Sequence, residues 1–193
     1  MKLCHSIEEI DVTGDVWQTL AHADKPIVMY GMGNGADKIL AVFDHYGITV
    51  SDFFASDGFV RHQQFHGKTV LSYGEICEKY EDFIIVVSFG TRLPEVLENI
   101  YRLDGERELY APDVPVVSES ARFDAAFFDA HRADLAAACE LFGDALSRQT
   151  FCDVILYRLT GKIAYLRRHT VTPAEAMPLI GAENFRETAD LGA

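Results

Sequence analysis

A glycine-rich turn is the part of this chain best suited to binding chemistry. It reads Gly31-Met-Gly33-Asn34-Gly35-Ala36, with a short apolar run before it and an amphipathic pattern after it. In a strand–turn–helix unit, Gly31 permits the tight turn, Gly33 lets a ligand approach the backbone, and Ala36 lets helix and strand pack. The unpaired N–H groups at the helix start, where Asn34 and Gly35 lie, favour an anion. The pattern predicts a nucleotide-type site, and its plain alternative is a tight turn without a ligand.

Two further loops supply candidate contacts to this site. Asp57 follows the second expected strand, near the place where dinucleotide-binding units carry an acidic residue for the ribose hydroxyls. Asp52 is closer in spacing but lies inside the strand pattern, so Asp57 is preferred. Thr91 and Arg92 follow the most apolar strand, where a hydroxyl and a guanidinium can hold a phosphate. The alternatives are a turn role for Asp57, a helix cap for Thr91 and a surface position for Arg92.

No residue pattern nominates a catalytic group or a metal site. His62 and His66 are spaced as metal ligands on a helix would be, but Gly58 and Gly67 around them indicate a loop or hairpin. The sequence has no Ser-His-Asp order and no G-x-S-x-G turn. The prediction is a binding site with no catalytic residues and no metal.

Composition narrows the class of partner. The formal charge of −13 argues against nucleic acid, because phosphate neutralisation needs clustered Lys and Arg, and it argues against an anionic membrane surface. The four cysteines are scattered and no C-x-x-C occurs, which favours reduced thiols. With no signal peptide and no long apolar run, the sequence predicts a cytoplasmic protein.

Apolar runs alternate with helical patterns through the first part of the chain. This alternation predicts the α/β class: a Rossmann-like parallel sheet with helices on both faces, followed by a helical segment. The expected units are a Rossmann-like nucleotide-binding-type domain over 1–118, a helical bridge over 119–185, and the start of another domain over 186–193. The expected strands are 27–30, 48–55, 69–71, 83–89, 108–110 and 114–117, and the expected helices are 15–23, 35–46, 73–80, 93–103, 123–142, 144–159 and 163–168.

Two resemblances attach to these patterns. Residues 25–103 loosely resemble the nucleotide-sugar-binding N-terminal domains of bacterial sugar acetyltransferases, through the glycine turn, the segments 53–57 and 67–73, and the loop 86–92. The chain as a whole is more similar to the front part of FkbM-type methyltransferases, which use S-adenosylmethionine. In that family a Rossmann-like module and a helical bridge precede a domain opening on D-x-G-A-x-x-G, and Asp190-Leu-Gly192-Ala193 matches its first half.

The resemblance implies a non-catalytic module that binds a nucleotide or nucleotide-sugar, with S-adenosylmethionine used only in a full-length protein. Because the printed sequence stops inside the second glycine motif, we expect this chain alone to transfer no methyl group. The expected partners are a small nucleotide ligand and the missing methyltransferase domain, and a homodimer stays open. Two rival functions remain: a small NAD(P)-binding oxidoreductase, and a docking module whose glycine turn is empty.

Overall fold

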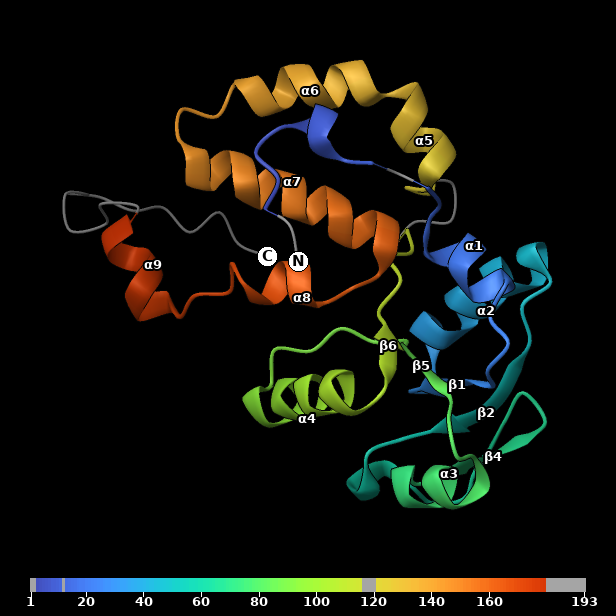
Figure 1. Cartoon of the computed structure of the whole chain (residues 1–193). Coiled ribbons are helices and arrows are strands. Elements are labelled where there is room, and N and C mark those ends of the chain that lie inside the picture. The colour runs from blue at the N-terminus through green and yellow to red at the C-terminus, as the bar shows by residue number, and fades with distance from the viewer. Residues whose placement is uncertain (1–2, 12, 116–120, 180–193) are drawn as a thin grey trace.

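The computed structural model describes residues 3–11, 13–115 and 121–179. Within them, six strands form one sheet in the order β3-β4-β2-β1-β5-β6 (Figure 1). Every adjacent pair is parallel except β3 with β4. The parallel strands therefore follow the spatial order third, second, first, fourth, fifth of a doubly wound sheet, which confirms the predicted α/β, Rossmann-like class. The strands are β1 Ile27–Tyr30, β2 Val50–Phe54, β3 Gln64–Phe65, β4 Lys68–Leu71, β5 Ile84–Val87 and β6 Glu108–Tyr110.

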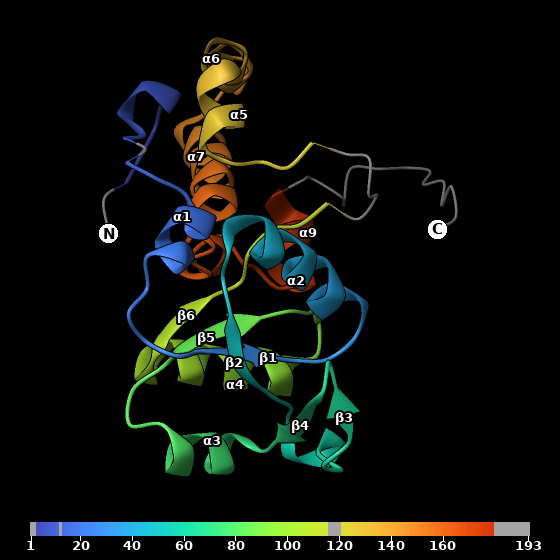
Figure 2. The same cartoon turned by 90° about the vertical axis from the view of Figure 1, so that its right-hand side faces the viewer.

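Helices cover both faces of this sheet, as predicted. All residues of β1 and β5 are buried, as expected for near-continuous apolar strands. Along β1, Ile27 and Met29 belong to the core shared with α1 and α2, while Val28 and Tyr30 belong to the core shared with α3 and α4. Figure 2 shows α2 on one side of the sheet and α3 and α4 on the other. These helices are α1 Val16–Ala21, α2 Asn34–Tyr46, α3 Tyr73–Lys79 and α4 Pro94–Glu106.

Helix ends lie where capping residues stand in the sequence. Helix α2 ends at Gly47, whose φ of 68° is the left-handed conformation that glycine adopts without strain. Helix α3 begins with a reciprocal capping box between Ser72 and Glu75. Asp144 caps the start of α7 (Ala145–Thr160) and Gly161 ends it in the left-handed conformation. These starts and stops were predicted.

A helical region follows the sheet. The predicted single helix over 123–142 is wrong, because Asp124 caps a shorter helix and the backbone leaves helical geometry at His131 (φ −111°, ψ 12°). Beyond the break, Arg132 donates to the Ile10 carbonyl at 3.1 Å and holds the next helix against the N-terminal segment. Helix α9 was not predicted. The helices of this region are α5 Ala125–Ala130, α6 Arg132–Glu140, α7, α8 Ala164–Arg167 and α9 Pro173–Leu179.

The N-terminal segment completes the core of the helical region. Cys4, Ile7 and Ile10 are buried among apolar residues of α5, α6 and α7, and the short 3-10 helix η1 (Ile7–Glu9) lies against α6. Asp15 joins this core to the sheet, because its Oδ1 caps α1 while its Oδ2 accepts from the Ala125 N–H at 2.9 Å. Segments from both ends of the sequence therefore build one helical layer (Figure 1).

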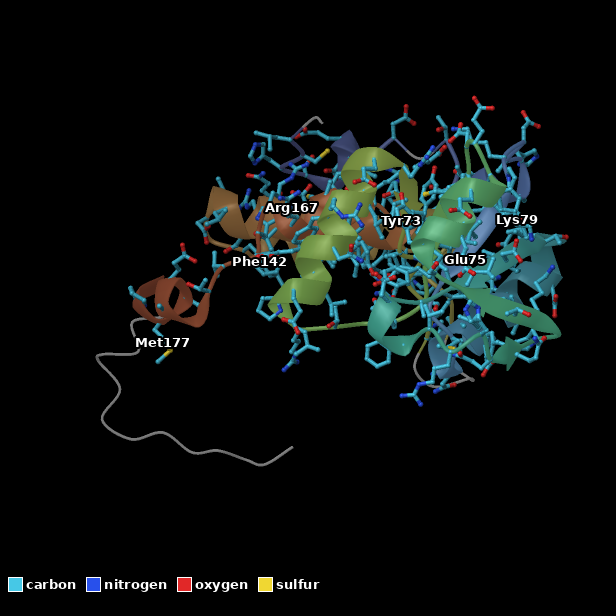
Figure 3. The ribbon with its side chains drawn as sticks, turned by 90° about the horizontal axis from the view of Figure 1, so that it is seen from below. Tyr73, Glu75, Lys79, Phe142, Arg167 and Met177 are labelled. Atoms are coloured by element: carbon cyan, nitrogen blue, oxygen red, sulfur yellow. The ribbon has the colours of Figure 1, made fainter. Side chains whose placement is uncertain are left out.

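The helical region is anchored along the β6 edge of the sheet. The Ala111 N–H donates to the Gly161 carbonyl at 2.8 Å, and the Lys162 ammonium donates to the Leu109 carbonyl at 3.1 Å. The Arg167 guanidinium lies over the Tyr101 ring at 4.3 Å, and Figure 3 shows Arg167 beside α4. The same view shows Tyr73 between α3 and α4. The region is thus packed on the sheet rather than held by a linker.

Two expectations fall wholly or partly outside the described residues. The expected strand 114–117 is not formed at Val114 and Pro115, since Pro115 has no N–H to donate to a sheet, and 116–117 lie outside the described residues. The expected domain start at 186–193 lies outside them as well. Among the helices of the described ranges, none has the length and apolar character that crossing a bilayer requires.

Candidate functional site

A cleft of about 370 Å³ opens at the carboxyl ends of β1, β2 and β5. It lies where the chain order reverses, because β1 pairs with β2 on one side and β5 on the other. Ligands of open α/β sheets bind in the crevice at this topological switch point. We call it the glycine-loop cleft; its lining is Tyr30, Gly31, Met32, Gly33, Asn34, Gly35, Ala55, Ser56, Phe59, Ser88, Phe89, Gly90, Thr91, Leu93 and Val96.

The structure explains the requirement for glycine differently at each of the three glycines of the loop. Gly31 has a φ of 112°, and a Cβ there would come within 2.6 Å of the Ser88 Oγ. Gly33 has a φ of 138°, a backbone conformation that favours glycine. The space around it is open, so a ligand can reach its backbone. A Cβ on Gly35 would lie 1.9 Å from the Ser88 carbonyl oxygen. Gly35 therefore allows the start of α2 to pack on the end of β5, a role that the sequence pattern assigned to Ala36.

Hydrogen bonds from the neighbouring strands fix the loop. The Gly31 N–H donates to the Phe54 carbonyl at 2.8 Å, and the buried Ser88 hydroxyl donates to the Tyr30 carbonyl at 3.0 Å. The Tyr30 hydroxyl pairs with that of Ser56 across the end of β2. The cleft is consequently built on the rigid ends of the central strands.

Two helices begin at the cleft without side-chain caps. Helix α2 has Gly33 as its N-cap, and α4 has Leu93 as its N-cap with Pro94 next; neither N-cap side chain makes a capping hydrogen bond. At the start of α2 the first-turn N–H groups have no intrahelical acceptor, and the helix dipole adds partial positive charge there. At α4 Pro94 carries no N–H and the Val96 N–H donates to the Leu93 carbonyl at 3.1 Å, so this helix start offers fewer free donors. Among the described residues that line the cleft, no side chain is charged. The anion-binding potential therefore comes from the backbone.

Apolar side chains around the cleft are unusually exposed. Phe59 is 67% exposed, Leu93 57% and Phe89 37%, and all three line the cleft. Phe59 follows β2 in the 3-10 helix η2 (Asp57–Phe59), and Gln63 holds this loop by donating to the Phe59 carbonyl and the Met32 sulfur. These apolar residues could not be predicted as part of the site, because single apolar positions in loops carry no periodic signal.

The predicted site residues divide into two groups. Gly31, Gly33, Asn34, Gly35 and Thr91 line the cleft together. Ala36, Asp57 and Arg92 are not among its lining residues: Ala36 is buried in the core between α2 and the sheet, and Asp57 and Arg92 are exposed. The Thr91 hydroxyl oxygen accepts from the Leu93 N–H at 3.2 Å, so Thr91 shapes the turn ahead of α4.

The other polar candidates have partners outside the cleft. Asp52 is buried and accepts from the Lys79 ammonium at 2.7 Å and from the Tyr80 hydroxyl. The two histidines lie on either side of the short strand β3 in a hairpin rather than on a helix, and His66 pairs with Asp37 at 2.7 Å. Across residues 3–11, 13–115 and 121–179, no group of three or more His, Cys, Asp or Glu side chains is placed to hold a metal ion.

Comparison with known proteins does not assign this site. The chain has no significant match to a family model, to a curated protein or to a solved structure. The chemistry of the cleft must therefore be argued from its own residues.

Proposed function

We propose that the glycine-loop cleft binds a nucleotide of the nucleotide-sugar class, and that the chain is the non-catalytic binding module of an FkbM-like methyltransferase. The observation that carries the binding proposal is the meeting of exposed apolar side chains and the uncapped start of α2 in one cleft. A nucleotide has both chemistries, because its base is flat and apolar on its faces while its phosphates are anionic. The order of a Rossmann-like unit followed by helices supports the family proposal.

The base would be held by the aromatic side of the cleft. Phe59 and Phe89 present exposed rings there, and the Phe89 ring packs edge-on against Tyr30 at 4.9 Å. Stacking of a base on an aromatic side chain contributes about 1–3 kcal/mol in nucleic-acid-binding proteins. A bound base would also remove the apolar surface of these rings from water, and this burial contributes favourably to the free energy of binding.

The phosphates would be held by the backbone at the start of α2. Gly33 leaves open space beside its backbone, which lets a phosphate reach the N–H groups of Asn34 and Gly35. Ser56, rather than a carboxylate, lines the cleft after β2, so the acidic ribose contact typical of dinucleotide-binding units is not among the lining residues. This arrangement counts against NAD as the ligand, because dinucleotide-binding units hold its ribose through that acidic residue.

Binding without catalysis is supported by the lining itself. Its protic side chains are the hydroxyls of Tyr30, Ser56, Ser88 and Thr91 and the amide of Asn34, and the described lining contains no imidazole, carboxylate, ammonium or thiol. General acid–base catalysis at neutral pH relies mostly on those missing types. We place this module in the cytoplasm, where its four free cysteines stay reduced.

Thermal unfolding against a ligand panel tests the proposal. We expect UDP- or GDP-sugars to raise the melting temperature, because a ligand at a hundred times its Kd stabilises a fold by about 2.7 kcal/mol. Gly33→Val should abolish this rise. Gly47→Val is the matched control, since Gly47 also has a positive φ (68°) with open space around it but lies outside the cleft lining. The proposal fails if no nucleotide shifts the melting temperature, or if both variants respond like the wild type.

A docking role is the second candidate, and a separate surface favours it. Leu141 is 86% exposed in the turn between α6 and α7, and the exposed side chains of Phe142, Leu146 and Val154 line one hollow that runs from this turn along α7. Apolar surface gathered in this way marks interaction sites in soluble proteins. Sedimentation analysis together with the ligand panel separates the two functions: a docking module should self-associate through this surface and respond to no nucleotide, and Leu141→Lys should keep it monomeric.

A further inference from the structure

A second cavity lies on the other side of the α2 start. Its volume is about 540 Å³, and it shares Asn34, Gly35, Ser88, Phe89 and Gly90 with the glycine-loop cleft. The two hollows therefore lie on either side of the backbone contact between Gly35 and Ser88. We call the second hollow the β6-side cavity, because residues that follow β6 form its far wall together with α7.

The β6-side cavity is lined by different chemistry from the cleft. Lys38, Asp113 and Tyr157 contribute an ammonium, a carboxylate and a phenol to its wall, whereas the described lining of the cleft has no charged side chain. Ile39 and Val114 add apolar surface between them. Pockets that orient a polar ligand commonly combine an apolar wall with a few converging polar groups.

Two polar groups in this cavity have unused hydrogen-bonding capacity. Asp113 accepts from the Arg158 side chain through Oδ2 at 2.6 Å, and within the described residues its Oδ1 has no hydrogen-bond partner. The Tyr157 hydroxyl likewise has no partner in the part of the chain that the structure describes. Burial, with the nearby Asp113 carboxylate, raises the pKa of Tyr157, so the hydroxyl stays protonated and can donate.

We infer that the β6-side cavity binds the sugar of a nucleotide-sugar whose nucleotide occupies the glycine-loop cleft, with Asp113 and Tyr157 as its hydroxyl-reading residues. The inference rests on the proposed function, since it needs a nucleotide in the neighbouring cleft. A sugar fits the cavity because its hydroxyls can donate to the Asp113 carboxylate and accept from the Tyr157 phenol. A diphosphate reaching from one hollow to the other would pass the start of α2, because Asn34 and Gly35 line both of them.

The helical region would then be part of the binding site. Tyr157 lies on α7, and the Arg158–Asp113 ion pair ties α7 to the loop after β6. The contacts that anchor this region on the sheet edge thus position the sugar-reading groups. The helical region, which the sequence predicts to be a bridge between two domains, would then determine which sugar is bound.

Calorimetric titration of the whole chain with matched ligand pairs tests the inference: UDP with UDP-glucose, and GDP with GDP-mannose. We expect the better nucleotide-sugar to bind about tenfold tighter than its diphosphate, as one or two added hydrogen bonds allow. Tyr157→Phe should remove most of this gain and leave the Kd of the diphosphate unchanged. Tyr165→Phe is the matched control, because Tyr165 lies on α8 and lines neither hollow.

The outcomes separate this inference from the proposed function. A diphosphate that binds with no gain from its sugar overturns the inference and leaves the nucleotide site standing. An equal gain in affinity from the sugar in the wild type and in Tyr157→Phe also overturns it, because the Tyr157 hydroxyl would then make no contact with the sugar. If neither diphosphate nor nucleotide-sugar binds, the nucleotide site and the inference both fall.

Discussion

Replacing Gly35 by alanine tests whether the glycine loop owes its shape to the contact with the end of β5. Gly35 lies in the first turn of α2, and alanine in a helix is normally more stable than glycine by about 0.5–1 kcal/mol. At this position, however, the new Cβ would lie 1.9 Å from the Ser88 carbonyl oxygen. Because that atom belongs to the backbone, no side-chain rotation can relieve the contact, and α2 or the loop after β5 must move.

The expected result of Gly35→Ala is therefore a net loss of stability. Overpacking of this kind costs about 1–3 kcal/mol, and we expect the upper end because the partner is backbone. Subtracting the helix-propensity gain leaves a loss of about 2 kcal/mol. In a chain of this size, that loss lowers the melting temperature by about 4–8 °C.

Urea unfolding of Gly35→Ala beside Gly105→Ala measures the effect. Gly105 lies in α4, and a Cβ there meets nothing within 4 Å, so its replacement should be neutral or stabilising by up to about 1 kcal/mol. The two variants should thus move the unfolding midpoint in opposite directions with unchanged slopes. If Gly35→Ala is as stable as Gly105→Ala, the close packing of α2 on β5 is refuted.

Three further predictions concern the scaffold. Asp15→Ala should destabilise the chain by about 2 kcal/mol in urea unfolding, because this buried carboxylate caps α1 and also accepts from the start of α5. Hydrogen bonds from the backbone and side chain of Ser72 lower the pKa of Glu75. The capping box therefore stabilises the fold above the ordinary glutamate pKa, and this contribution is lost as pH falls through the lowered pKa. In Ser72→Ala, an NMR titration should show the Glu75 pKa moving up toward 4.5. Burial raises the pKa of Cys152 to about 12, so a thiol reagent at neutral pH should modify the half-buried Cys77 first and reach Cys152 only on unfolding; rapid native modification of Cys152 would contradict its burial.

Local sequence signals were enough to predict the five parallel strands, but the short antiparallel β3 was not predicted and the expected strand 114–117 is not formed at Val114 and Pro115. The apolar run of β1, the glycine loop after it and the stop at Gly47 are encoded within a few residues of one another, and the structure has them where expected. Alternation of strands and helices then restricted the topology, because crossovers between parallel strands have one hand. The break at His131 was missed because the helical pattern continues through it, and the N-terminal segment that packs there lies far away in sequence.

The site was harder to predict than the fold. The glycine loop could be predicted, because closely spaced glycines indicate a particular backbone conformation. Asp57, in contrast, lies in the short turn η2 and is not among the residues that line the cleft. The lining side chain from that turn is Phe59, a single apolar residue that no sequence pattern indicates as a ligand contact. Asp113 and Tyr157 line one cavity only because α7 packs on the β6 edge, which no local pattern encodes.

An amide NMR titration of the chain with UDP and with GDP tests the central claim most directly. If the glycine-loop cleft holds a nucleotide, saturable shifts should centre on the amides of Gly33, Asn34 and Gly35 and extend to Gly90 and Thr91, which line the same cleft. The absence of shifts with either diphosphate, or shifts confined to the exposed apolar surface around the α6–α7 turn, would contradict a nucleotide site and favour docking.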